Sequence, residues 1–89
     1  MQVVLFPAFG RVVKKIHASA KQDLDEAVKE LLKNPEAGDL KKGDLAGISV
    51  FKFRMVKQLT LLAYTYDESD DCLTLLALGP HENFYRDLK

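Results

Sequence analysis

The sequence predicts a mixed α/β (α+β) fold, in which a short N-terminal strand and a two-helix hairpin pack on a twisted antiparallel sheet of about four strands. Two stretches carry apolar residues at helical spacing, residues 8–16 and 19–33. Three runs rich in apolar and aromatic residues follow, at 48–56, 58–66 and 72–78, each bounded by turn residues. Two amphipathic helices bury their apolar faces only against a further surface, and these strands supply it.

The length and composition indicate one soluble domain covering residues 1–89. A chain of 89 residues has material for one hydrophobic core, and 47% apolar with 29% charged residues is typical of a globular protein. No apolar run reaches the roughly 18 residues that span a bilayer, and the first residues lack a basic leader. We therefore expect a cytoplasmic protein with no membrane partner.

The N-terminal segment predicts a strand and then a helix. Residues 2–6 form a β-branched run that ends at Pro7, which has no amide proton for a strand ladder. The apolar residues of the first helix recur at i, i+3, i+4 and i+7: Phe9, Val12, Val13 and Ile16.

The second helix has a start signal, an apolar stripe and a stop signal. Ser19 followed by Gln22 predicts a capping box, and Asn34-Pro35 predicts the end of the helix. Asp23 lies early in the helix, where the helix dipole favours an acid. The expected buried stripe is Leu24, Ala27, Val28, Leu31 and Leu32.

Three further segments are expected to lie outside the main helices and strands. Residues 38–47 predict a glycine-rich loop, and residues 81–88 a turn or short helix after the breaker Gly79-Pro80. The sequence DESDD at 67–71 is either a solvated turn or a device that repels nucleic acid.

A hairpin is predicted between the second and third strands, with Lys57 and Gln58 as the two turn residues. Its expected cross-strand pairs are Arg54 with Leu61, Lys52 with Ala63, and Phe53 with Leu62.

Two cations interrupt the apolar run of the second strand. The net charge is zero, but residues 48–62 hold Lys52, Arg54 and Lys57 without any acid. Because strand side chains alternate, Phe51 and Phe53 are expected to face the core while Lys52 and Arg54 share the open face, roughly 7 Å apart. This face is either an ordinary solvated surface or an anion site that binds adjacent phosphates.

Three residues near the C-terminus bear on this choice. His81, Tyr85 and Arg86 follow the last strand and could fold back over its end. A histidine and a phenol beside two cations suit chemistry on a phosphodiester.

Several ordered blocks resemble the RelE/ParE superfamily, toxins of bacterial type II toxin–antitoxin pairs. They are NPEAGD, KKGDLAGISVFKFRM, LTLLAYTY and LTLLALGPHENFYRDL. The last block is the most specific, because members end a strand in glycine and continue with a basic residue and then a tyrosine, here Gly79, His81 and Tyr85.

The resemblance implies a site for RNA cleavage. RelE-like members cut mRNA on the ribosome by activating a ribose 2′-hydroxyl, which requires a base, cations around the phosphate and an acid for the leaving oxygen. By resemblance, Lys52 acts as base or phosphate ligand, Arg54 stabilises charge, His81 acts as acid or base, and Tyr85 stacks on or orients the nucleotide.

Three departures from the RelE pattern keep other functions open. Leu61 occupies the place of an arginine in the third strand, and His81 stands where an arginine is common. The chain is also neutral, whereas RelE-like toxins are commonly basic. Lys57 or Arg86 would then have to supply the missing RNA contact. The alternatives are a ParE-like poison of DNA gyrase, or a degenerate toxin that only binds its antitoxin.

The resemblance also implies a cognate antitoxin as partner, besides the ribosome and mRNA or DNA gyrase. The antitoxin is expected to dock as a helix or as an added strand, with a helix across the basic face or in place of residues 81–89 preferred. No nucleotide-binding loop and no cluster of metal ligands is found in the sequence, and the lone Cys72 is interpreted as structural. We therefore expect no cofactor and no metal.

Overall fold

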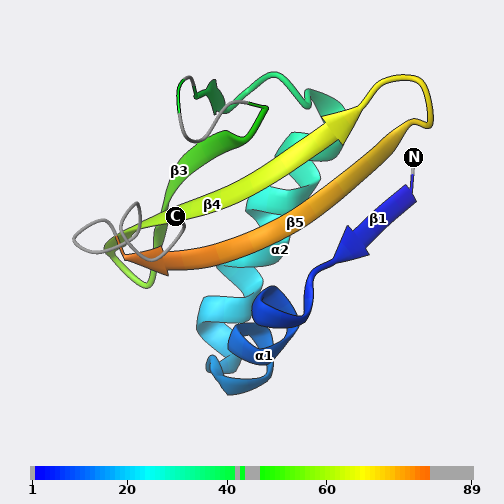
Figure 1. Cartoon of the computed structure of the whole chain (residues 1–89). Helices are drawn as coiled ribbons and strands as arrows, with labels where there is room; N and C mark the ends of the chain where they lie inside the picture. The colour runs from blue at the N-terminus through cyan, green and yellow to red at the C-terminus, as the bar shows by residue number, and fades with distance from the viewer. Residues whose placement is uncertain (1, 42, 44–46, 81–89) are drawn as a thin grey trace.

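In the computed structural model, two helices pack against one face of a single five-stranded sheet (Figure 1). The structure describes residues 2–41, 43 and 47–80. The elements are β1 (Gln2–Leu5), α1 (Pro7–Lys15), α2 (Ala18–Lys33), β2 (Asp39–Leu40), β3 (Ser49–Met55), β4 (Gln58–Asp67) and β5 (Cys72–Pro80). Neither helix has the length and apolar character needed to cross a membrane, as far as the described part of the chain extends.

The predicted class is confirmed, with two differences in the sheet. Its order is β1-β5-β4-β3-β2, so β4 is central. The sheet is mixed, because β1 pairs in parallel with β5 while the other pairs are antiparallel. The helical hairpin carries the chain from β1 to the opposite edge, and the last strand then returns beside the first. The second difference is β2, which forms within the predicted loop by pairing with Ser49 and Val50.

The helices bury part of the predicted stripes, and Val12, Val13, Ile16 and Val28 are only partly buried. Phe9 is buried on α1, and α2 buries Ala20, Leu24, Ala27 and Leu31, whereas Leu32 remains 38% exposed. These residues meet the sheet in one cluster: Phe9, Leu24, Leu31, Leu62, Tyr64, Leu73, Leu75 and Leu78.

The predicted capping box is wrong. The residue before α2 is His17, and it makes no side-chain hydrogen bond to the helix start. Ser19 therefore lies inside the first turn of the helix, two residues after the capping position.

The predicted hairpin register is wrong by two residues. Met55 pairs with Gln58, so the turn residues are Val56 and Lys57, and Lys52 lies opposite Leu61. The remaining predicted pairs are replaced by Arg54 with Leu59 and Phe53 with Thr60. The faces are unchanged, because a shift of two residues preserves the alternation of a strand.

A buried tyrosine ties the end of α2 to the central strand. The hydroxyl of Tyr64 donates to the carbonyl oxygen of Pro35 at 2.6 Å and accepts from the amide of Gly38 at 3.0 Å. Burial of the ring raises the pKa of the Tyr64 phenol, partly offset by the Gly38 amide. The contact fixes the segment that leads from α2 into β2.

Gly38 is required by the same contact. A Cβ at this position would lie 2.6 Å from the Tyr64 hydroxyl oxygen and 3.0 Å from the carbonyl oxygen of Val50. Any side chain at residue 38 would displace the tyrosine or the strand.

We predict that Tyr64→Phe lowers the free energy of unfolding by about 1–3 kcal/mol, because Pro35 and Gly38 lose their buried partner. Since folding raises the phenol pKa, the neutral form stabilises the wild type below about pH 10 and this contribution is lost above it. Urea unfolding between pH 7 and 11 measures both effects. Tyr66→Phe, which removes only an exposed hydroxyl contact, is the control.

Two glycine substitutions should have opposite effects. Gly38→Ala should destabilise the fold through the clash with Tyr64, whereas Gly10→Ala in α1 meets nothing within 4 Å. Gly10→Ala should therefore stabilise by about 0.5–1 kcal/mol, the difference in helix propensity. Thermal melts of both variants check this, and equal effects would contradict the tight approach at residue 38.

Candidate functional site

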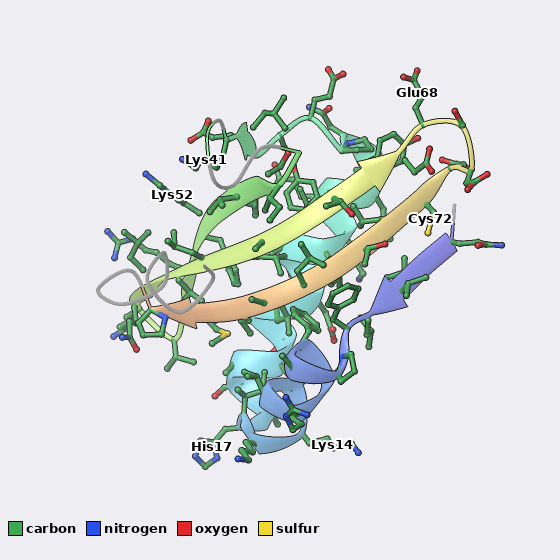
Figure 2. The ribbon with its side chains drawn as sticks, viewed as in Figure 1. Lys14, His17, Lys41, Lys52, Glu68 and Cys72 are labelled. Atoms are coloured by element: carbon green, nitrogen blue, oxygen red, sulfur yellow. The ribbon has the colours of Figure 1, made fainter. Side chains whose placement is uncertain are left out.

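The candidate site lies on β3 and on the turn that follows it. Lys52 and Arg54 are exposed, while Phe51 and Phe53 are half-buried and pack toward the helices. The predicted difference in exposure between the cations and the aromatic residues is confirmed, but Arg54 also lines a hollow together with Phe51 and Phe53. Figure 2 shows the Lys52 side chain extending from β3 into solvent.

Arg54 lies where β3 is an open edge, because β2 pairs only with Val50 and Ser49. Its Nη1 donates to the carbonyl oxygen of Lys57 at 3.5 Å. Its side chain also lines a hollow of about 230 Å³ with Asp23 and Glu26 of α2. Arg54 thus contacts the hairpin turn through one long hydrogen bond.

The turn adopts a conformation that its residues disfavour. Val56 has φ 51° and Lys57 has φ 67°, both in the left-handed region, at a cost of about 1–2 kcal/mol each. For a β-branched residue such as Val56 this φ is an outlier. Asp23 counters the cost, because its Oδ2 accepts a hydrogen bond from the Val56 amide at 2.8 Å.

Sequence reasoning missed Asp23 as a part of this site. It interpreted the residue only as an acid that suits the helix dipole. No local pattern connects Asp23 with Val56, since 33 residues separate them.

Paired residues on three neighbouring strands connect the cations of β3 with the end of β5. Lys52 pairs with Leu61, and Leu61 pairs with Gly79. Neighbouring strands lie about 4.8 Å apart, so the Gly79 backbone is roughly 10 Å from that of Lys52. Leu61 is fully buried in a second apolar cluster with Val50 and Ala63, which confirms that an apolar residue shares the face of Lys52.

Three predicted site residues, His81, Tyr85 and Arg86, lie outside the described residues. Their roles remain predictions. Lys57 is described and exposed, and it occupies the turn beside Arg54.

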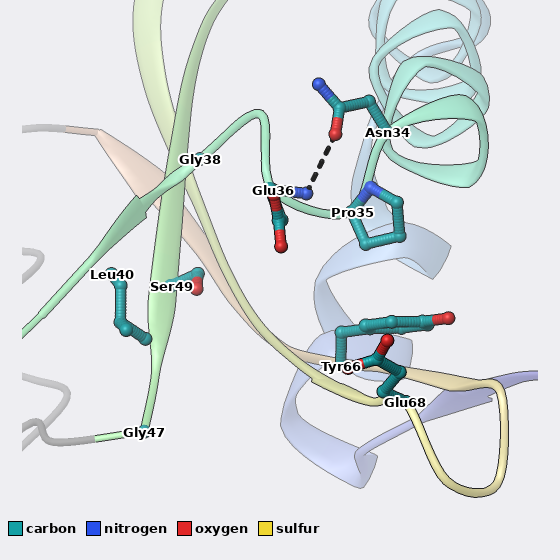
Figure 3. Close-up of a pocket in the computed structure, with 9 residues that line it drawn as sticks. All are labelled: Asn34, Pro35, Glu36, Gly38, Leu40, Gly47, Ser49, Tyr66 and Glu68. Carbon is teal, nitrogen blue, oxygen red and sulfur yellow. Dashed lines mark hydrogen bonds between the residues drawn. The ribbon is translucent and has the colours of Figure 1, made fainter.

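The other end of β4 is acidic. A cavity of about 500 Å³ there contains Glu36, Glu68 and Tyr66 among its lining residues (Figure 3). The Tyr66 hydroxyl donates to Asp71 at 2.9 Å; this bond raises the pKa of the Tyr66 phenol and lowers that of the Asp71 carboxyl. Phosphate binding is disfavoured at this end.

A third hollow, of about 360 Å³, lies between β1 and the two helices. Its lining is mainly apolar and includes Val3, Leu5 and Phe9, with Lys21 and Asp25 among its polar residues. Within the described ranges, no group of three or more His, Cys, Asp or Glu side chains is placed to hold a metal ion.

Solved structures with a similar fold include several toxins of toxin–antitoxin systems. The intact E. coli RelBE toxin–antitoxin complex contains a chain of TM-score 0.73 at 14% identity, with 91% of this chain and 96% of that chain covered. The YoeB/ParE toxin from Agrobacterium tumefaciens matches with TM-score 0.73 at 18% identity, covering 91% and 99%. The RelBE2 complex from Mycobacterium tuberculosis gives 0.64 at 20% identity, covering 90% and 96%.

At these identities the likeness establishes the fold alone. No curated protein matches the sequence significantly. The sequence model of the ParE-like toxin of type II bacterial toxin–antitoxin systems, however, matches residues 3–89. This match covers nearly the whole chain and confirms the resemblance to the RelE/ParE superfamily. The chain therefore belongs to the ParE-like toxins of type II toxin–antitoxin systems.

Proposed function

We propose that this toxin is a ribosome-dependent mRNA endonuclease that inhibits translation in the cytoplasm. The observation that carries the proposal is the exposed pair Lys52 and Arg54 on one strand, about 7 Å apart, which matches the spacing of adjacent phosphates. The RelE chains of similar fold are consistent with it.

The proposed reaction breaks the bond between phosphorus and the 5′-oxygen. The ribose 2′-hydroxyl loses its proton to a base and attacks the adjacent phosphorus, and the leaving 5′-oxygen takes a proton from an acid. The products are a 2′,3′-cyclic phosphate and a 5′-hydroxyl. Arg54 stabilises the charge on the phosphate, and Lys52 serves as a phosphate ligand or as the base.

The C-terminal residues complete the proposed site. His81 follows directly after Pro80, the last residue of β5, and would supply acid–base chemistry. Tyr85 would stack on a base of the RNA, and Arg86 and Lys57 would bind its backbone.

Leu61 supports a second candidate, a ParE-like poison of DNA gyrase without nuclease activity. This buried leucine lies opposite Lys52, where a third cation would strengthen a phosphate site. The net charge of zero also provides no general attraction for RNA.

The proposed partner is a cognate antitoxin, as in the toxin–antitoxin complexes of similar fold. Strand β1 lies at a sheet edge and exposes Val3, Val4 and Leu5, and the next residue, Phe6, is also exposed. The amides of Gln2 and Phe6 are directed to the β5 side, where each donates to a backbone oxygen. The amides of the alternate residues Val3 and Leu5 are therefore directed to the open edge.

An antitoxin segment could add a strand at this edge and fill the adjacent apolar hollow, as an alternative to a helix on the basic face.

We predict that Lys52→Ala and Arg54→Ala each reduce mRNA cleavage by about 100-fold, the effect of removing one charge-stabilising group. His81→Ala should abolish most of the remaining activity. Primer extension on mRNA from a translation reaction with purified toxin measures the new ends. Lys14→Ala, an exposed cation on α1, is the matched control (Figure 2).

Two results would contradict the nuclease. The first result is an absence of new mRNA ends in a reaction with active ribosomes, together with trapped complexes of gyrase and cleaved DNA. This result would favour the gyrase poison. The second result is an absence of mRNA cleavage, of gyrase poisoning and of growth arrest on induction. This result would favour a degenerate toxin that only binds its antitoxin.

For the antitoxin, we predict that Leu5→Lys weakens binding by about 10- to 100-fold, because a charge would enter the apolar hollow beside β1. Calorimetry with the purified antitoxin provides the measurement. Arg54→Ala should leave affinity unchanged if β1 is the docking edge. Loss of binding in Arg54→Ala but not in Leu5→Lys would instead place the antitoxin on the basic face.

A further inference from the structure

The geometry points to Asp23 as a positioning residue for the basic face. We infer that its carboxylate holds the Val56–Lys57 turn in the left-handed conformation and thereby fixes Arg54 and Lys57 for binding an RNA phosphate. This inference rests on the proposed function for its purpose, but the contact itself does not depend on it. Asp23 belongs to α2, outside the strand and turn that carry the cations.

The turn needs an anchor from outside the hairpin. A two-residue hairpin of this geometry favours Asn-Gly, because both residues require a positive φ. Here the residues are Val56 and Lys57, with φ 51° and 67°. The Val56 side chain is 55% exposed, so its own burial contributes little to holding the turn.

Asp23 is well placed to be that anchor. Its Oδ2 lies 2.8 Å from the Val56 amide nitrogen, a short bond with a charged acceptor. The helix that carries it is fixed, because Leu24, Ala27 and Leu31 are buried. The carboxylate therefore acts from a rigid support.

The hairpin turn also contacts Arg54. The guanidinium donates to the carbonyl oxygen of Lys57, whose direction depends on the backbone angles of the turn. Arg54 also lines the same hollow as Asp23, with Glu26 and Glu30 as the other acids there. Relaxing the turn would move the carbonyl group away and free the guanidinium.

The test compares three variants of the full chain. Asp23→Ala removes the acceptor, Asp23→Asn keeps one, and Asp23→Ala with Val56→Asn supplies a residue that tolerates the left-handed region. Two quantities are measured: hydrogen exchange of the residue 56 amide by NMR, and binding of a short single-stranded RNA by fluorescence anisotropy.

We expect Asp23→Ala to speed exchange at residue 56 and to weaken RNA binding by about tenfold. Asp23→Asn should stay close to wild type. The double variant should recover most of the RNA affinity, because the turn then holds itself. A purely structural role for Asp23 predicts no such rescue.

Unchanged exchange at residue 56 in Asp23→Ala would overturn the inference, as would RNA affinity that Val56→Asn fails to restore. Failure of the proposed function has a different signature, namely the absence of new mRNA ends in a reaction that contains wild-type toxin and active ribosomes. In that case the exchange rates alone decide whether Asp23 holds the turn.

Discussion

The hydroxyl of Tyr64 joins the end of α2 to the central strand, and the rest of the structure depends on this contact. It satisfies the carbonyl of Pro35 and the amide of Gly38 at once, in a fully buried position. With the end of the helix fixed there, β2 can form against β3 and the cavity at the acidic end takes its shape. The absence of a side chain at residue 38 is the condition for this approach.

Helix α2 is held to the sheet by polar contacts at two places. Tyr64 fixes the segment after its C-terminus, and Asp23, near its start, binds the β3–β4 turn. A helix of 16 residues is about 24 Å long, enough to extend along much of the sheet. One rigid element thus sets the position of both the acidic end and the basic turn, while its residues Leu24 and Leu31 join the main core cluster.

The strands of the sheet separate charge in this neutral protein, although three acids of α2, Asp23, Glu26 and Glu30, line a hollow with Arg54. Lys52, Arg54 and Lys57 lie on β3 and its turn, whereas Glu36, Glu68 and Asp71 lie toward the other end of β4. A phosphate chain would be attracted locally to the first group and repelled by the second. This arrangement would suit the proposed binding of an RNA backbone in one orientation.

The sequence by itself determined the class of fold, the helices, and which side chains of β3 face the core, because these follow from the spacing of apolar residues along the chain. It also placed Lys52 and Arg54 on the exposed face of that strand. Only the tertiary structure decided the parallel pairing of β1 with β5, the turn at Val56 and Lys57, and the contacts of Asp23 and Tyr64. These features join residues far apart in the chain, or require backbone angles that the local residues disfavour. Packing of the whole domain therefore selects them, and no local sequence pattern predicts them.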